Sequence, residues 1–124
     1  MNIMVVEDNP INRKLVCVVL NAEGHDVRST ETAEEAIEAI RRAKPDILLL
    51  DLALPGMNGL EMARNLKRDD TTKDIPIVVV TAFPNRWPRE AVLAAGCDGY
   101  IVKPLDIRLL AGQLAGLGPR PARD

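Results

Sequence analysis

One carboxylate ends the most hydrophobic stretch of this sequence. In PDILLLDLALPGMNG, residues 45–59, an apolar run leads straight into Asp51, and the chain then turns through Pro55-Gly56. Carboxylates are nucleophiles toward phosphorus and form aspartyl phosphates. Asp51 on its own would be interpreted as a solvated loop residue, so its chemistry depends on which groups lie beside it.

Other polar groups also follow apolar runs. Glu7 and Asp8 come after IMVV, Thr81 ends IPIVVVT, and Lys103 follows GYIV. If these runs are parallel strands of one sheet, all of these groups meet at one edge. Three carboxylates in one cleft repel one another, and Mg²⁺ is the natural partner because it takes oxygen ligands and bridges carboxylates and phosphates.

The charges of this set suit phosphoryl transfer. Glu7, Asp8 and Asp51 supply −3, and Mg²⁺ together with Lys103 supplies +3, so the site is neutral before a substrate arrives. One oxygen of Asp51 then stays free as a nucleophile, while Thr81 offers a hydroxyl and Lys103 a cation for the transferred oxygens. Each group alone has an ordinary structural explanation, but their common placement at strand ends favours a site.

The segments that must position these groups alternate between strand and helix patterns. Strand-like runs cover residues 3–6, 26–30, 46–50, 75–81 and 99–102. Five helices are expected between and after them, starting at caps or helix-initial prolines, namely Asn9-Pro10, Thr32, Asn58, Pro88 and Asp106. The alternation predicts an α/β fold, a doubly wound, flavodoxin-like parallel sheet with helices on both faces and strand order 2-1-3-4-5.

Size and composition define one domain. The 124 residues are 47% hydrophobic and 27% charged, and the net charge of −2 comes without a block of Lys or Arg, which argues against nucleic-acid binding. No apolar run approaches the roughly 20 residues of a membrane span, and no signal-peptide layout opens the chain, so we expect a cytoplasmic protein without a membrane partner. The domain is expected to cover residues 1–117, with 118–124 as a short C-terminal tail.

Four motifs resemble the receiver domain of bacterial two-component and phosphorelay response regulators. They are VVEDNPINRKL, DILLLDLALPGMNGLE, VVVTA and AAGCDGYIVKPLD, and the similarity spans nearly the whole chain. The resemblance implies a stand-alone receiver in which Asp51 accepts a phosphoryl group from a phosphohistidine of a sensor kinase or a histidine phosphotransfer protein. It also implies signalling by phosphorylation-controlled protein contacts or onward phosphotransfer. The only catalysis implied is Mg²⁺-dependent self-phosphorylation from phosphodonors, and autodephosphorylation.

The same resemblance assigns ligands to the metal ion. It implies that Asp8 and Asp51 bind Mg²⁺ directly, that Glu7 acts through water, and that the backbone carbonyl of Ala53 completes the protein ligands. Mn²⁺ is an alternative ion. Lys103 is expected to contact the phosphoryl group, and the proline that follows it is a candidate for a cis peptide bond, Pro104.

Switch and partner residues also follow from the resemblance. Thr81 and Tyr100 match the pair in which a hydroxyl moves toward the phosphoryl group and an aromatic ring turns inward.

Trp87 has two interpretations. Its ring packs over the short fourth helix, or it contacts a partner, because Trp is enriched in binding hot spots. Tyr100 is also a partner-contact candidate. Kinase docking on the first helix implies contacts at Ile11, Asn12 and Leu15, while Ile11 and Leu15 are equally explained by ordinary helix packing. We expect a monomer that can dimerise on phosphorylation, with an unknown downstream protein target.

Three other functions compete with phosphoryl acceptance. A phosphatase of the haloacid-dehalogenase type needs an acid two residues after its nucleophile, where this chain has Ala53. A flavin carrier of similar topology needs a phosphate loop after the first strand, but Glu7 and Asp8 are anionic there and aromatic residues make up only 2% of the chain. The third alternative, a receiver-like module that binds partners without phosphorylation, is left open by the sequence.

Overall fold

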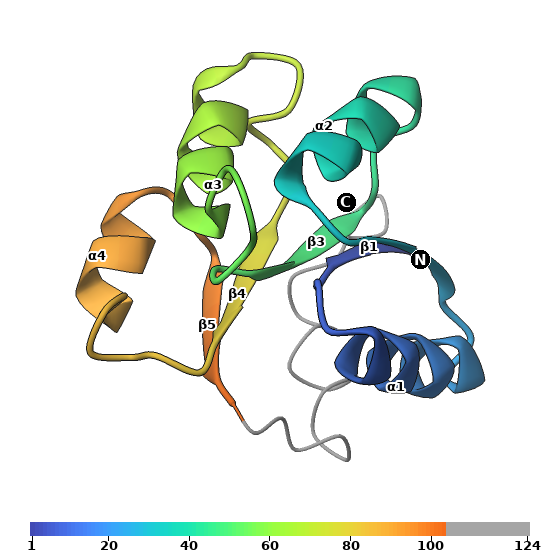
Figure 1. Ribbon diagram of the computed structural model, residues 1–124. Coiled ribbons are helices and arrows are strands. Elements are labelled where there is room, and N and C mark those ends of the chain that lie inside the picture. Colours follow the sequence, from blue (N-terminus) through green and yellow to red (C-terminus); the bar gives the residue numbers. More distant parts are fainter. Residues whose placement is uncertain (104–124) are drawn as a thin grey trace, which may run out of the picture.

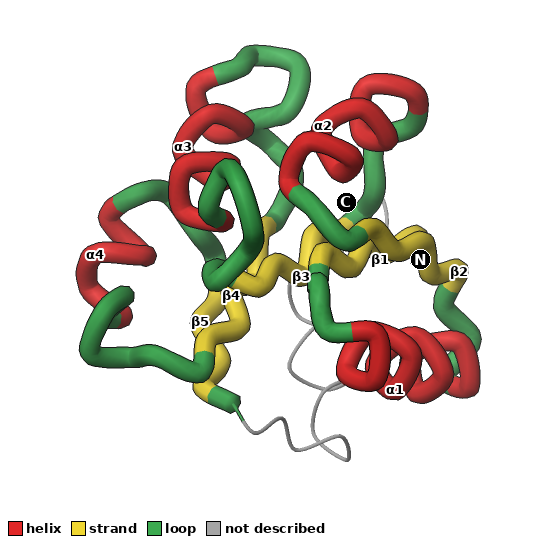
Figure 2. The backbone as a smooth tube through the Cα atoms, in the orientation of Figure 1, coloured by secondary structure: helices red, strands yellow, loops and turns green. Residues whose placement is uncertain are grey.

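Five parallel strands form one sheet in the order β2-β1-β3-β4-β5 (Figure 1, with β2 labelled in Figure 2). The computed structural model describes residues 1–103 of the 124 residues. The strands are β1 (Asn2–Val6), β2 (Asp26–Thr30), β3 (Ile47–Asp51), β4 (Ile77–Thr81) and β5 (Gly99–Val102). The predicted parallel α/β sheet and its strand order are therefore confirmed.

Helices cover both faces of the sheet (Figure 2). The described helices are α1 (Pro10–Ala22), α2 (Ala33–Arg42), α3 (Gly59–Arg68) and α4 (Arg89–Ala94). One face packs against α1, and the opposite face packs against α2, α3 and α4. The fifth helix predicted after Asp106, the candidate cis bond at Pro104 and the predicted tail all lie outside the described residues. No helix within residues 1–103 is long and apolar enough to cross a membrane.

Strand β3 is buried along its whole length. Leu48 and Leu50 pack with the α2, α3 and α4 side of the core, whereas Ile47 and Leu49 pack with the α1 side. Alternate side chains of a strand point to opposite faces, so an apolar run without alternation is what a strand covered on both sides requires. This two-sided packing holds the end of β3, and with it Asp51, at a defined place on the sheet edge.

The predicted caps start three of the helices. Asn9 accepts hydrogen bonds from the backbone N–H groups of Ile11 and Asn12 at the start of α1. The Thr32 hydroxyl accepts from Glu35 N at 3.1 Å at the start of α2. The Asn58 side chain accepts from Glu61 N at 2.9 Å at the start of α3. Each bond satisfies an N–H group that has no partner inside its helix.

Four elements have boundaries that differ from the sequence-based prediction. Strand β1 begins at Asn2, one residue early, and β3 covers Ile47–Asp51, so that it starts and ends one residue later than predicted. Helix α4 begins at Arg89, because Pro88 is its N-cap and has an extended backbone. Strand β4 begins at Ile77 and not at residue 75. Ile75 donates its N–H back to the Thr72 carbonyl in a turn, and Pro76 has no N–H for the ladder, so pairing starts one residue later.

Candidate functional site

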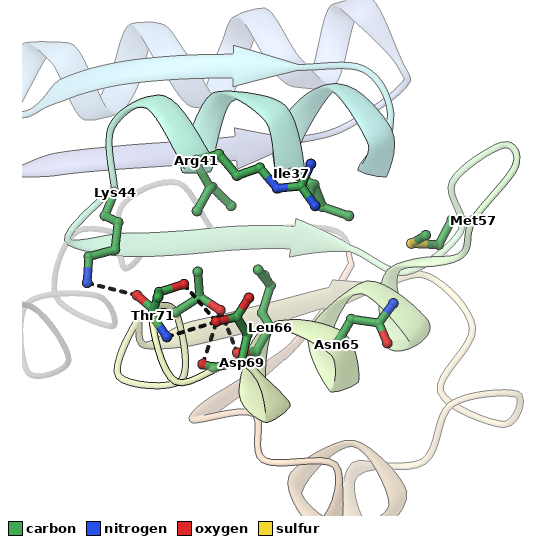
Figure 3. Close-up of a pocket in the computed structure, with 10 residues that line it drawn as sticks. Ile37, Arg41, Lys44, Met57, Asn65, Leu66, Asp69 and Thr71 are labelled. Atoms are coloured by element: carbon green, nitrogen blue, oxygen red, sulfur yellow. Dashed lines mark hydrogen bonds between the residues drawn. The ribbon is translucent and has the colours of Figure 1, made fainter.

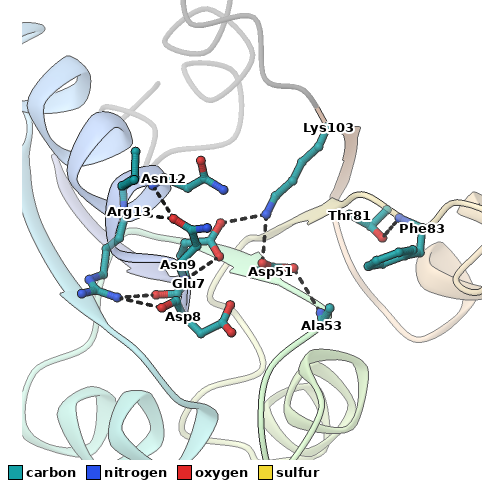
Figure 4. A network of polar contacts seen from close by, with 11 residues as sticks. Glu7, Asp8, Asn9, Asn12, Arg13, Asp51, Ala53, Thr81, Phe83 and Lys103 are labelled. Carbon is teal, nitrogen blue, oxygen red and sulfur yellow. Dashed lines mark hydrogen bonds and ion pairs between the residues drawn. The ribbon is translucent and has the colours of Figure 1, made fainter.

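Three carboxylates from two neighbouring strands meet at the carboxyl edge of the sheet. Val6 is paired with Leu50, so the residues that follow β1 lie beside the end of β3. One carboxylate oxygen from each of Glu7, Asp8 and Asp51 lies within 4.8 Å of the others (Figure 4). Glu7 and Asp51 are buried and Asp8 is exposed, so the cluster opens to solvent on the Asp8 side.

The Lys103 side chain forms ion pairs with two of these three carboxylates. Its Nζ lies 2.8 Å from Glu7 Oε1 and 3.0 Å from Asp51 Oδ2. The Lys103 N–H also donates to the Thr81 carbonyl at 2.8 Å, which extends the β4–β5 pairing up to the lysine. With all four groups ionised the set carries a charge of −2, which a divalent cation would neutralise. The all-oxygen donor set also suits a hard cation, so these residues could hold one.

The second oxygen of Asp51 faces the chain that follows it. Asp51 Oδ1 accepts a hydrogen bond from Ala53 N at 3.1 Å. Both oxygens of the acid therefore have a donor, one from the backbone and one from Lys103. The contact of Ala53 shown by the structure involves its N–H group, and the metal-binding role of its carbonyl stays a prediction.

Burial and crowding change the proton affinity of Glu7. Burial raises its pKa to about 7; a hydrogen bond with Asp51 and the negative charge of Asp51 act in the same direction, and Lys103 only partly opposes them. For Lys103, burial by itself would lower the pKa, but the hydrogen bonds and charges of Glu7 and Asp51 outweigh it and raise the pKa. Near neutral pH the metal-free site therefore holds a proton on Glu7 in a large fraction of molecules.

This shift predicts a pH-dependent stability. The unfolded chain has a Glu7 pKa of 4.5 and the folded chain one of about 7, so the folded state binds the proton more tightly. The stability that this proton contributes is complete below pH 4.5 and is lost as the pH rises through 7. We expect metal-free wild type to lose about 3 kcal/mol relative to Glu7→Gln between pH 4.5 and 8, from a pKa that rises from 4.5 to about 7. Urea unfolding of both proteins in EDTA, at several pH values, measures it; parallel pH profiles would contradict it.

The predicted switch residues have local partners in this structure. The Thr81 hydroxyl accepts a hydrogen bond from Phe83 N at 2.9 Å. The Tyr100 hydroxyl donates to the backbone carbonyl of Trp87 at 2.5 Å. Thr81 and Tyr100 thus both bond to the β4–α4 loop, at its two ends. Their part in a switch stays a prediction.

The Trp87 ring is packed rather than presented to solvent. Its side chain is 7% exposed and belongs to the core on the α2, α3 and α4 side. Arg86 lies over the ring at 4.4 Å from its centroid, and Phe83 meets it edge to face at 6.4 Å. Of the two sequence-based interpretations, packing describes Trp87 here, while Phe83 is the exposed aromatic residue of this loop.

An apolar stripe runs along the outside of α1. Ile11 is 77% exposed, Leu15 46% and Val18 55%, and their spacing puts them on one side of the helix. Asn12 lies half-buried at the start of the same helix. The stripe includes two of the predicted docking residues and adds Val18, whose place within the apolar run LVCVVL gave no sign of exposure.

A groove lies apart from the cluster of Glu7, Asp8 and Asp51 (Figure 3). This groove of about 630 Å³ runs between α2 and α3, with Ile37, Ile40 and Leu66 among its apolar lining. Three of its polar residues, Lys44, Asp69 and Thr71, bond to one another. Lys44 Nζ donates to the Thr71 carbonyl, and the Thr71 hydroxyl and N–H both bond to Asp69, which lowers the pKa of that carboxyl. Among the described residues, the crowded acidic groups therefore lie in the three-carboxylate cluster and not in this groove.

Two residues that support the site gave no clear signal in the sequence. Arg13 donates to the backbone carbonyl of Glu7 at 2.8 Å, and the sequence had assigned it no role. Gly59, the first residue of α3, lies directly against the backbone of Asp51; a Cβ atom there would be 2.5 Å from the Asp51 carbonyl oxygen. Its position after the Asn58 cap indicated a helix start but not this close approach.

The sheet order, the strand-end carboxylates and the opposing lysine define a receiver domain. The chain belongs to the response regulator receiver domain family, whose sequence pattern matches residues 3–115. It is 38% identical over 106 residues to the polar-differentiation response regulator DivK of Brucella anthropi, and the match covers 86% of each chain. This confirms the resemblance to two-component signalling proteins.

Solved structures agree with this assignment. A putative response regulator from Chloroflexus aurantiacus superposes with a TM-score of 0.88 at 28% identity, covering 94% of this chain and 95% of that one. The receiver domain of a sensor histidine kinase from Pseudomonas aeruginosa, with a magnesium ion coordinated in its active-site cleft, superposes with a TM-score of 0.85 at 28% identity, covering 94% and 95%.

Proposed function

We propose that Asp51 accepts a phosphoryl group from a phosphohistidine of a sensor kinase or a histidine phosphotransfer protein. A carboxylate oxygen of Asp51 forms a bond to phosphorus while the phosphorus–nitrogen bond breaks, and the imidazole leaves with the electron pair. The observation that carries the proposal is the meeting of Glu7, Asp8 and Asp51 with Lys103 at one sheet edge. The alternative of a phosphorylation-independent module gives no reason for crowding three acids there.

Mg²⁺, or Mn²⁺ in its place, is the cofactor that we propose for the cluster. Asp8 and Asp51 would hold it directly, Glu7 through water, and the Ala53 carbonyl would complete the protein ligands. When bound, the ion supplies positive charge that offsets the charge of the phosphoryl oxygens. The proposal is supported by the three-carboxylate set and by the magnesium-containing receiver domain from Pseudomonas aeruginosa.

The chain's own residues perform the rest of the chemistry. Lys103 holds Asp51 in place and would contact the transferred oxygens. A phosphoryl group on Asp51 would offer the Thr81 hydroxyl a charged acceptor, and charged acceptors make stronger hydrogen bonds than neutral ones. Rotation of Thr81 toward it would withdraw the acceptor that now binds Phe83 N and would loosen the loop to which Tyr100 is bonded.

The signalling partners are proposed from the same geometry. The stripe of Ile11, Leu15 and Val18, with Asn12 beside it, is the proposed contact for the kinase or phosphotransfer protein, because exposed apolar stripes on helices mark interaction sites. A change at Thr81 and Tyr100 would be read by a downstream protein, or the phosphoryl group would pass onward to a histidine. We propose a cytoplasmic monomer that can dimerise when phosphorylated, with its receiver domain over residues 1–117.

Mass spectrometry tests the proposed function. Wild-type protein incubated with acetyl phosphate and Mg²⁺ should gain one base-labile phosphoryl group, and EDTA should prevent it. Borohydride reduction of the acyl phosphate, followed by peptide mapping, identifies the acceptor. Reduction at Asp51 supports the proposal. Reduction at another residue, or the absence of any Mg²⁺-dependent adduct, would refute it.

A further inference from the structure

The Asp8 carboxylate is placed almost entirely by its backbone. Within residues 1–103 no group donates a hydrogen bond to its oxygens, and its side chain is exposed. It nevertheless lies close to Asp51, whose negative charge repels it, and to Glu7, which adds to the repulsion whenever it is ionised. Something must therefore hold the peptide backbone of residues 7 and 8 against that repulsion.

Arg13 contacts this backbone from the side away from the lysine (Figure 4). Its Nη1 donates to the Glu7 carbonyl at 2.8 Å and approaches the Asp8 carbonyl at 3.5 Å. Its Nη2 lies 3.1 Å from Glu31 Oε1, in the loop between β2 and α2. The Arg13 side chain is only 18% exposed, so the guanidinium is packed into these contacts and does not sample solvent freely.

The position of Arg13 follows from the local structure. The Asn9 cap starts α1, and the Arg13 N–H bonds to the Asn9 carbonyl at 2.9 Å in the first turn. A long side chain in this turn leans back toward the helix start, where residues 7 and 8 lie. The planar guanidinium can then bond the loop with one nitrogen and Glu31 with the other, which a lysine ammonium cannot do with the same geometry.

We propose that Arg13 is a positioning residue for the metal site. It connects the β1–α1 loop to Glu31 and so keeps the Asp8 carboxylate beside Asp51, where both can bind one cation. This inference rests on the proposed function of the cluster as an Mg²⁺ site. Partners that orient metal ligands from behind commonly change metal affinity by roughly 10–100-fold when they are removed.

The direction of the effect separates positioning from simple electrostatics. Arg13 is a cation near an acidic cluster, so loss of its charge alone would strengthen the binding of Mg²⁺. Loss of positioning would weaken it. The neighbouring Lys14 provides a matched control, because it is exposed on the same helix and makes no contact with the loop within the described residues.

Calorimetric titration of metal-free protein with Mg²⁺ tests the inference. We expect Arg13→Met to raise the Kd roughly tenfold, Lys14→Met to leave it unchanged or lower it, and Arg13→Lys to give an intermediate value. Arg13→Lys keeps the charge and a similar length, so it also serves if Arg13→Met does not fold. A Kd for Arg13→Met or Arg13→Lys equal to or below that of wild type would overturn the proposal.

Hydrogen exchange provides a readout without metal. The backbone amides of Asp8 and Asn9 should exchange faster in metal-free Arg13→Met than in wild type or Lys14→Met. If wild type itself binds no Mg²⁺, the proposed function of the cluster fails, while the exchange rates still show whether Arg13 holds the loop. Unchanged exchange at both amides would refute the positioning role.

Discussion

Asp51→Asn should abolish phosphoryl incorporation while making the metal-free protein more stable. An amide oxygen has no charge and is a far weaker nucleophile, so no adduct should form with acetyl phosphate and Mg²⁺. The same change removes one of the three crowded negative charges. Because Asp51 contributes to the raised pKa of Glu7, that pKa should fall toward its ordinary value and Glu7 should pair fully with Lys103.

The stability effect has a size and a measurement. We expect Asp51→Asn to stabilise the metal-free fold by ~1 kcal/mol, from relief of the repulsion. The gain in melting temperature on addition of Mg²⁺ should shrink, because a site with fewer carboxylates binds the ion less tightly. Intact-mass spectrometry reports the adduct, and thermal unfolding with and without Mg²⁺ reports the stability.

Asp70→Asn is the matched control for this substitution. Asp70 is an exposed carboxylate that pairs only with Lys73 in the described part of the chain. Asp70→Asn should leave both the phosphoryl adduct and the change in melting temperature with Mg²⁺ as they are in wild type. A normal adduct on Asp51→Asn would rule out Asp51 as the acceptor, and an unchanged response to Mg²⁺ would remove Asp51 from the metal site.

Gly59→Ala should be among the most damaging single-methyl changes in the described chain. A Cβ atom at this position would lie 2.5 Å from the Asp51 carbonyl oxygen and 2.8 Å from Leu52 Cα. Both are backbone atoms of buried residues, the last residue of β3 and the one that follows it, so neither can move away as a flexible side chain would. The Gly59 N–H also donates to the Leu52 carbonyl at 3.0 Å, which holds the start of α3 against this strand.

The expected loss of stability combines a steric cost with a gain in helix propensity. Forced overpacking costs about 1–3 kcal/mol, and the better helix propensity of Ala offsets up to about 1 kcal/mol of it. We expect a net loss of about 2 kcal/mol together with weaker Mg²⁺ binding, because the displaced backbone carries Asp51. Urea unfolding and Mg²⁺ titration measure the two effects.

Gly24→Ala separates steric overlap from backbone strain. Gly24 has φ of +91°, and no atom lies within 4 Å of the place that a Cβ atom would take, so Ala there meets strain without a clash. It should cost about 1 kcal/mol and leave Mg²⁺ affinity unchanged. If Gly59→Ala proves as stable as wild type, the close contact with Asp51 has no structural importance.

Local patterns in the chain were sufficient to predict the fold and most of the acid cluster. Apolar runs without alternation mark strands covered on both faces, and three side-chain caps lie where the sequence placed them. Because parallel strands end at a common edge, the positions of Glu7, Asp8 and Asp51 along the chain already implied that they meet. The β4 boundary was misplaced because the turn ending at Ile75 and Pro76 competes with strand pairing.

The orientation of individual side chains required the tertiary structure. Trp87 was equally consistent with packing and with exposure until the fold placed it in the core beneath Arg86. The local bond of Thr81, likewise, depends on the course of the β4–α4 loop.

The sequence by itself determined which groups can do chemistry and at which edge of the sheet they collect, because strand direction and periodicity are local properties. Only the tertiary structure decided how that edge is held. Three contacts between separate segments hold it. Arg13 bonds to the Glu7 backbone, Gly59 lies against Asp51, and Lys103 bonds to Asp51, 52 residues away in the chain. Such contacts depend on the packing of the whole domain, so they cannot be predicted from a local sequence pattern.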